Sequence, residues 1–205
     1  RLGASALMQG LADGYFVLPY TIQNYLADQI NVPRFSTDSP EFGEAEKGIE
    51  DRIQKLMNIK GDKSVDYYHR KLGIIMWDNV GMAREAAGLK EAVEKIDALK
   101  KEFWSNVRIP GVANTTNQEL EKALRVADYF EIGQLMARDA LNREESCGGH
   151  FRLEHQTEEG EALRHDDEFA YVSCWEYMGE DKEPVMYKEP LDYEFIVREQ
   201  RNYKS

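Results

Sequence analysis

The stretch LKEAVEKIDALKKEFWSN, residues 89–106, decides the fold because its apolar residues recur at helical spacing. Steps of three and four residues place them on one face of a helix with 3.6 residues per turn, and Glu and Lys occupy the other face. The stretch therefore predicts an amphipathic helix that buries one side. The residues of the apolar face are Ala92, Val93, Ile96, Leu99 and Phe103.

Three more stretches carry the same period, over residues 40–59, 65–87 and about 117–143. Pro40 suits a first helical turn, Gly61 suits a helix stop, and Ser64 is a candidate N-cap for the second stretch. The sequence Thr116 to Glu119 is a capping box that announces the last helix. Long amphipathic helices joined by short loops predict a mainly α protein, an antiparallel helix bundle. Because the connection at Gly88 is very short, we expect residues 65–87 and 89–106 to stack nearly end to end, giving three long rods.

The two ends of the chain differ from this central part. Residues 5–28 predict a helix in two pieces, divided by Gly14 and Pro19, with a partly uncovered apolar face that could drive self-association. Residues 31–42 predict a linker. After Arg143 the helical period is lost, and residues 169–178 and 184–191 predict a β-hairpin. The apolar face comprises Met8, Leu11, Tyr15 and Phe16.

Composition excludes several function classes. The 205 residues carry a net charge of −12, which disfavours nucleic acid and anionic lipid as partners. No apolar run approaches the roughly 20 residues that span a bilayer. Cys147 and Cys174 have no metal-type spacing, and the histidines at 150, 155 and 165 fit no standard ligand pattern, so we predict no metal site.

Four motifs occur in the order in which one enzyme family carries them. They are RLGASAL (1–7), IIMWDNVGMAREAAGLKEAVEKI (74–96), NQELEKAL (117–124) and ALNREESCGGHFR (140–152). The set resembles the C-terminal portion of the flavoprotein subunit of succinate dehydrogenase/fumarate reductase. The resemblance implies a remnant of the FAD-binding domain with its linker (1–37), a spectrin-like three-helix bundle (38–143), and a C-terminal loop, β-hairpin and tail (144–205).

The resemblance also implies a function. The family interconverts succinate and fumarate by hydride transfer with FAD. It passes electrons to an iron–sulfur subunit and a membrane-anchor cytochrome b subunit. The implied location is peripheral, on the cytoplasmic side of the inner membrane. Because the chain contains no G-x-G-x-x-G fingerprint, we expect that it neither retains FAD nor turns over succinate by itself.

Carried over residue by residue, the resemblance assigns substrate binding to Arg1. A dicarboxylate needs a permanently charged, bidentate partner, which a guanidinium supplies. It assigns FAD contacts to Ser5, Ala6 and Leu7, at a helix N-terminus that favours negative charge. No catalytic residue is assigned. The loop at 147–152 departs from the family, with Cys147 in place of Arg and Gly149 in place of Ala, and its expected role is structural or at an interface.

Two alternatives stay open. An L-aspartate oxidase-like flavoenzyme shares the substrate arginine and a helical C-terminal domain, but it tends to lack a tail such as residues 169–205. A non-catalytic helical interaction module is the rival from another class. The tail and the match over Trp77 to Arg84 favour the respiratory enzyme.

Overall fold

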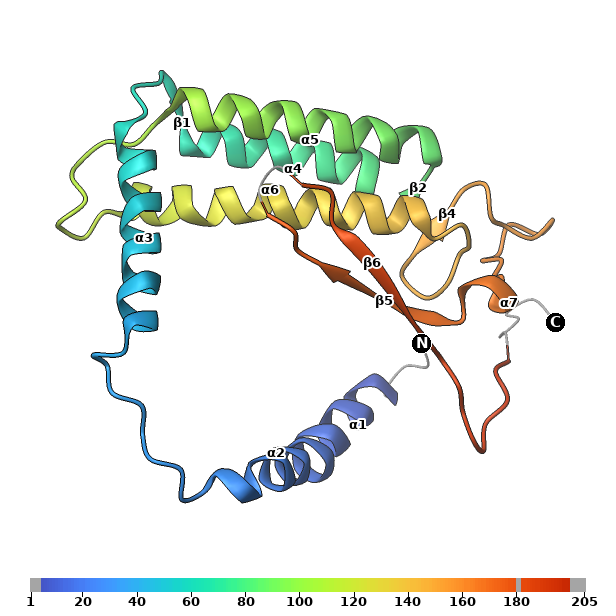
Figure 1. The fold of residues 1–205 in the computed structure, drawn as a ribbon. Coiled ribbons are helices and arrows are strands. Elements are labelled where there is room, and N and C mark those ends of the chain that lie inside the picture. Colours follow the sequence, from blue (N-terminus) through green and yellow to red (C-terminus); the bar gives the residue numbers. More distant parts are fainter. Residues whose placement is uncertain (1–4, 180–181, 200–205) are drawn as a thin grey trace. The chain divides into compact units, whose positions relative to one another are not determined.

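The computed structural model describes residues 5–179 and 182–199, and helices dominate both of its compact units, 1–51 and 52–205 (Figure 1). In the first unit, α1 (Ser5–Ala12) continues through a π-helical turn, η1 (Asp13–Val17), into α2 (Leu18–Leu26) and a 3₁₀ turn, η2 (Ala27–Gln29). Pro19 stands in the first turn of α2, directly after the π-helical turn. The predicted division into two helical pieces is thus confirmed, with a π-helical turn between them.

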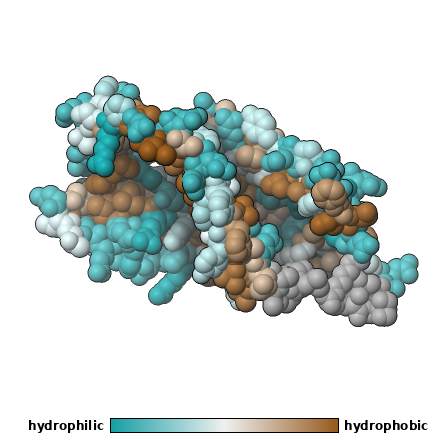
Figure 2. Space-filling view, turned by 90° about the horizontal axis from the view of Figure 1, so that it is seen from below, coloured by the Kyte–Doolittle hydropathy of each residue, from teal (hydrophilic) through white to brown (hydrophobic). Residues whose placement is uncertain are grey.

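The apolar face predicted for the first unit is exposed. Met8, Leu11, Tyr15 and Phe16 keep between 53% and 71% of their surface in contact with solvent. Figure 2 shows apolar side chains at the molecular surface among hydrophilic ones. Exposed apolar area of this kind is typical of a surface that packs against another polypeptide.

Helix α3 (Pro40–Asn58) begins at the predicted proline, and its last residues belong to the second unit, where Leu56 is buried. Helices α4 (Val65–Val80), α5 (Ala86–Asn106) and α6 (Gln118–Asn142) pack against one another in that unit. The ion pair from Lys122 to Asp66 joins the starts of α6 and α4, so these two helices run parallel and α5 runs antiparallel to both.

Aromatic rings occupy the centre of this bundle. Phe103 of α5 contacts Tyr68 of α4 edge to face, with ring centroids 5.3 Å apart, and lies 5.4 Å from Phe130 of α6. All three side chains are fully buried, so one residue from each helix builds the core. The other buried hydrophobic side chains of the three helices are Val65, Leu72, Val80, Leu89, Ala92, Ile96, Leu99, Leu120, Ala123, Val126, Ala127, Ala137 and Ala140.

The caps follow local chemistry. Ser64 accepts a hydrogen bond from the N–H of Tyr67 at 3.2 Å, as predicted for an N-cap. At the start of α6 the cap is Asn117, one residue after the predicted Thr116. Its Oδ1 accepts from the N–H groups of Glu119 and Leu120, both at 3.1 Å.

Two pairs of very short parallel strands lie at the ends of the bundle. Strand β1 (Lys63–Ser64) pairs with β3 (Val107–Arg108), and β2 (Ala83–Arg84) pairs with β4 (Phe151–Arg152). The first pair lies at one end of the bundle and the second at the other (Figure 1).

The prediction that the second and third helical stretches stack end to end is wrong. Helix α4 ends at Val80 rather than near Ala87, because the backbone at Gly81 turns extended and β2 follows. The chain reverses there, and α5 packs beside α4. The bundle is therefore built from α4, α5 and α6.

The predicted hairpin is confirmed. After a short helix, α7 (Asp166–Phe169), strand β5 (Tyr171–Glu176) pairs antiparallel with β6 (Val185–Pro190). Among the described residues, no helix has the length and apolar character needed to cross a membrane.

Candidate functional site

The predicted FAD-contacting residues Ser5, Ala6 and Leu7 lie in the described part of helix α1. Leu7 is 72% exposed, and this part of the helix carries no acidic side chain beside it. Arg1, the predicted substrate ligand, lies outside the described residues.

A second cluster of functional groups lies where α4 and α6 end. His150 accepts a hydrogen bond at Nδ1 from Nη1 of Arg84, 2.8 Å away, and its Nε2–H donates to the carbonyl of Arg143 at 2.9 Å. These partners fix a neutral imidazole with the proton on Nε2. Burial lowers the pKa of His150, and the charges of Arg84 and Arg152 lower it further, although the bond to the Arg143 carbonyl opposes them.

Arg84 also caps the end of α4. Its Nε donates to the carbonyls of Val80 at 3.1 Å and Gly81 at 2.9 Å. A guanidinium is stabilised near these carbonyls by the negative end of the helix dipole. Burial lowers the pKa of Arg84 from its usual value, although the charge of Asp139 opposes this shift.

Arg152 caps the C-terminal end of α6 in the same way, and only 2% of its surface is exposed. Its Nη1 donates to the carbonyls of Ala140 at 2.9 Å and Leu141 at 3.3 Å, and its Nε donates to Glu154 at 3.2 Å. The buried hydroxyl of Ser146 accepts from the backbone N–H of Arg152 at 2.8 Å. The guanidinium is thus satisfied by helix carbonyls and one carboxylate, which is what a buried charge requires.

Arg143 connects the bundle to the hairpin. Its Nη1 donates to Glu145 at 2.8 Å and to the carbonyl of Phe169 at 3.0 Å, and its Nη2 donates to the carbonyl of Tyr171 at 2.9 Å. The guanidinium carbon also lies 4.9 Å from the centre of the Tyr171 ring. This arginine thereby fixes the start of β5 to the end of α6.

Cys147 lies beside these groups in a shallow pocket of about 370 Å³ with Arg84, Arg143 and His150. Burial raises the pKa of the Cys147 thiol, which lowers its reactivity. Both ring nitrogens of His150 already bond other groups. The cluster accordingly holds elements together, which agrees with the structural role expected for this loop.

Sequence reasoning singles out the motif at 140–152 but misses the capping role of Arg84. A signal is available in the sequence. Arg84 follows Val80, the last residue of α4, by four positions, and an arginine near a helix C-terminus can donate hydrogen bonds to the last carbonyls of the helix. Elsewhere, the rings of His155 and His165 meet edge to face at 5.4 Å. Within the described ranges, no three His, Cys, Asp or Glu side chains gather as metal ligands.

Comparisons with known proteins show which proteins this chain is similar to. The family model described as the fumarate reductase flavoprotein C-terminus matches residues 69–203. The fumarate reductase flavoprotein subunit of Proteus vulgaris is 30% identical over 108 residues, covering 53% of this chain and 18% of that protein. The succinate dehydrogenase flavoprotein subunit of Bacillus subtilis is 22% identical over all 205 residues, which cover 33% of that protein.

A further relative is an uncharacterized FAD-dependent oxidoreductase of Methanocaldococcus jannaschii, 34% identical over 109 residues, covering 53% of this chain and 19% of that protein. Among solved structures, a quinol fumarate reductase of Escherichia coli shares the fold, with a TM-score of 0.70 at 19% identity over 83% of this chain and 28% of that one. The chain spans about a fifth to a third of the length of these curated relatives.

Proposed function

Since this chain belongs to the fumarate reductase flavoprotein C-terminal family, we propose that it is the C-terminal portion of a flavoprotein subunit that interconverts succinate and fumarate. The observation that carries the proposal is the family match over residues 69–203, which includes most of the bundle formed by α4, α5 and α6 as well as the hairpin. The collinear similarity to the Bacillus subtilis succinate dehydrogenase subunit over all 205 residues extends the same interpretation to the N-terminal helices.

In this proposal the chain divides by function. Residues 1–37 belong to the FAD-binding domain and its linker, 38–143 to the helical domain, and 144–205 to a loop, hairpin and tail. The absence of helical structure between η2 and Pro40, all within the described residues, supports a linker at the first boundary. The arginine cluster at the end of α6 supports a scaffolding role, because it fixes the loop and hairpin to the bundle.

Ser5, Ala6 and Leu7, which belong to helix α1, would hold one edge of FAD. FAD supplies the hydride acceptor or donor for the reaction. Arg1 would bind one carboxylate of succinate or fumarate with two parallel hydrogen bonds. This chain contributes a substrate clamp, cofactor contacts and a scaffold, and the remaining chemistry belongs to the rest of the flavoprotein.

The partners proposed by analogy are an iron–sulfur subunit and a membrane-anchor cytochrome b subunit, with the flavoprotein held peripherally at the cytoplasmic side of the membrane. The solved structures that share the fold include a quinol fumarate reductase and a Mycobacterium smegmatis Sdh1 complex, which supports membership of a multi-subunit assembly. Co-purification of the complete flavoprotein with an iron–sulfur protein would test this part of the proposal.

The deciding experiment expresses the complete flavoprotein that contains this chain and measures its flavin spectrum and turnover. We expect bound FAD, succinate-dependent reduction of an artificial electron acceptor, and fumarate-dependent oxidation of a reduced viologen dye. Turnover of L-aspartate in place of succinate would assign the chain to an L-aspartate oxidase. A protein without flavin and without either activity would favour a helical interaction module. Residues 1–205 alone should neither retain FAD nor oxidise succinate.

A further inference from the structure

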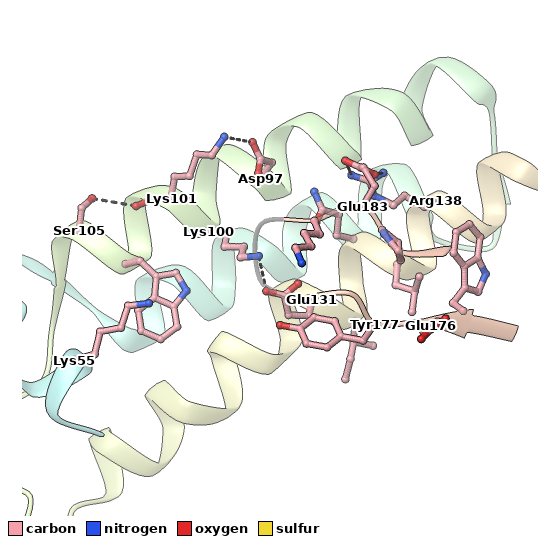
Figure 3. A pocket seen from close by; sticks show the side chains of 18 residues that line it. Lys55, Asp97, Lys100, Lys101, Ser105, Glu131, Arg138, Glu176, Tyr177 and Glu183 are labelled. Atoms are coloured by element: carbon pink, nitrogen blue, oxygen red, sulfur yellow. Dashed lines mark hydrogen bonds and ion pairs between the residues drawn. The ribbon is translucent and has the colours of Figure 1, made fainter. Parts of the chain in front are cut away.

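A large cleft lies in the second compact unit, residues 52–205. It has a volume of about 710 Å³ and is walled by one face of α5, one face of α6, and the end of the β-hairpin. Figure 3 shows Lys55 and Ser105 at one end, Glu176 towards the other, and Lys100 with Glu131 between them. The volume lies within the range of ligand-binding sites in proteins.

The cleft is elongated, with an indole ring at each end. Lys100 pairs with Glu131, so these residues are level on the antiparallel helices α5 and α6. Trp104 lies one helical turn beyond Lys100, towards the C-terminal end of α5. Asp139 lies about two turns beyond Glu131, towards the C-terminal end of α6, and it accepts the hydrogen bond from the Trp175 indole. Because the helices are antiparallel, these two directions are opposite. At 1.5 Å of rise per residue, the two indoles are separated along the helices by about 18 Å.

Both indoles are held in place. The Nε1–H of Trp175 donates to Oδ1 of Asp139 at 2.8 Å. Trp104 contacts the ring of Phe103 edge to face at 5.4 Å, and the ammonium group of Lys55 lies 4.3 Å from its centre. Both side chains are nevertheless partly exposed to the cleft, so each offers a preformed aromatic surface.

Basic and acidic side chains, joined in ion pairs, line the space between the indoles. Lys100 pairs with Glu131 across α5 and α6, and Arg138 pairs with Glu183 between α6 and the segment that leads into β6. Such a lining offers donors and acceptors side by side, which suits the alternating N–H and C=O groups of a peptide backbone better than a ligand of a single charge.

We propose that this cleft binds an extended peptide segment of a partner protein, with an aromatic or large apolar residue at each end and polar residues between. Alternate side chains of an extended chain lie on the same face, so the two anchors must be an even number of residues apart. Six residue steps of about 3.3 Å cover about 20 Å, which matches the separation of the indoles. The predicted recognition element is therefore a segment of seven residues with anchors at its first and seventh positions.

The test uses the 205-residue chain and the blocked heptapeptide acetyl-Phe-Ser-Lys-Gly-Glu-Ser-Phe-amide. The chain has three tryptophans, and Trp77 on α4 is 83% exposed and outside the cleft, so the three indole N–H signals in a ¹⁵N–¹H NMR spectrum report on location. Each signal is assigned from a single Trp→Phe variant. We expect the peptide to shift the signals of Trp104 and Trp175 together and to leave Trp77 unchanged.

Two control peptides sharpen the result. A peptide with only one Phe should shift one of the two cleft indoles, and a peptide with Phe at positions one and six should bind more weakly by roughly three- to tenfold, the worth of one aromatic contact. Binding that shifts Trp77 equally, or that moves only one cleft indole with the full heptapeptide, overturns the proposal. No shift at all overturns it as well.

A variant pair completes the test. Gln134 lines the middle of the cleft from α6 and is outside the buried core, so Gln134→Phe should narrow the cleft and weaken binding about tenfold, the loss of one well-placed contact. Trp77→Ala should bind as the unchanged chain does. Unchanged affinity in a Gln134→Phe variant that keeps its helical circular dichroism would contradict the proposal.

Discussion

Nη1 of Arg84 donates a hydrogen bond to Nδ1 of His150 at 2.8 Å, joining the segment after α4 to the loop after α6. Because Nε2 of the same imidazole donates to the carbonyl of Arg143, the contact requires neutral His150. Protonation would place a second positive charge against the Arg84 guanidinium. The loop that carries the family motif is therefore attached to the bundle by a bond that depends on pH.

Acidification should weaken the second unit through His150. Since burial lowers the pKa of His150 below its usual 6.5, the unfolded chain takes up a proton first as the pH falls, and the free energy of unfolding decreases below that pH. Thermal unfolding between about pH 7.5 and pH 5.5 should show a shallower loss of Tm for His150→Gln than for the unchanged chain. His69→Gln, at an exposed position of α4, is the matched control and should follow the unchanged chain. Identical pH slopes for all three proteins would refute this role.

Removing the buried guanidinium of Arg152 should be strongly destabilising. Arg152→Met leaves the carbonyls of Ala140 and Leu141 without their donor and should lower the free energy of unfolding by about 3 kcal/mol. Urea denaturation measures this change. Arg70→Met on the exposed side of α4 should alter stability by less than about 0.5 kcal/mol. A comparable effect of both substitutions would argue against the capping role.

Two glycines should respond to alanine in opposite directions. A Cβ at Gly61 would overlap the carbonyl oxygen of Asn106, next to the pairing of β1 with β3, so Gly61→Ala should cost about 2 kcal/mol. At Gly73, inside α4, a Cβ would meet no group within 4 Å beyond its own turn of the helix, and Gly73→Ala should add up to about 1 kcal/mol through helix propensity. Chemical denaturation of both variants decides the matter, and stabilisation by Gly61→Ala would be inconsistent with the structure.

The proposed substrate clamp makes a kinetic prediction for the complete flavoprotein. Arg1→Lys keeps the charge but loses the bidentate geometry, so kcat/KM for succinate should fall by about 10- to 100-fold, the value of one charge-assisted hydrogen bond. The flavin absorbance spectrum should remain unchanged, which separates substrate binding from cofactor loss. An unchanged kcat/KM would remove Arg1 from the site.

Much of the fold can be predicted from local patterns. Apolar periodicity locates α3, α5 and α6, and the hydroxyl of Ser64 is recognisable as a cap because capping involves groups three residues apart. The hairpin is also visible, since β5 and β6 are rich in aromatic and β-branched residues on either side of a Gly-containing turn.

The misplaced end of α4 and the missed arginine roles share one cause, which is contact between residues far apart in the sequence. After the end of α4 at Val80, Ala83 pairs with Phe151, and no local sequence pattern predicts that pair. The roles of Arg84, Arg143 and Arg152 likewise depend on which helix ends meet. The motif at 140–152 marks the region by its resemblance to a family, but only the structure shows that its arginines bind the carbonyls of helix and strand ends.

The two short parallel strand pairs have a mechanical consequence. Strand β1 precedes α4 and β3 follows α5, so tension applied to the ends of the second unit pulls these paired strands along their length in opposite directions. The same holds for β2 and β4, which flank α5 and α6. Parallel pairs stretched in this way load their hydrogen bonds together rather than one after another. In a force-extension experiment, the bundle should therefore unfold in abrupt steps when these two strand pairs break, rather than by gradual unwinding of its helices.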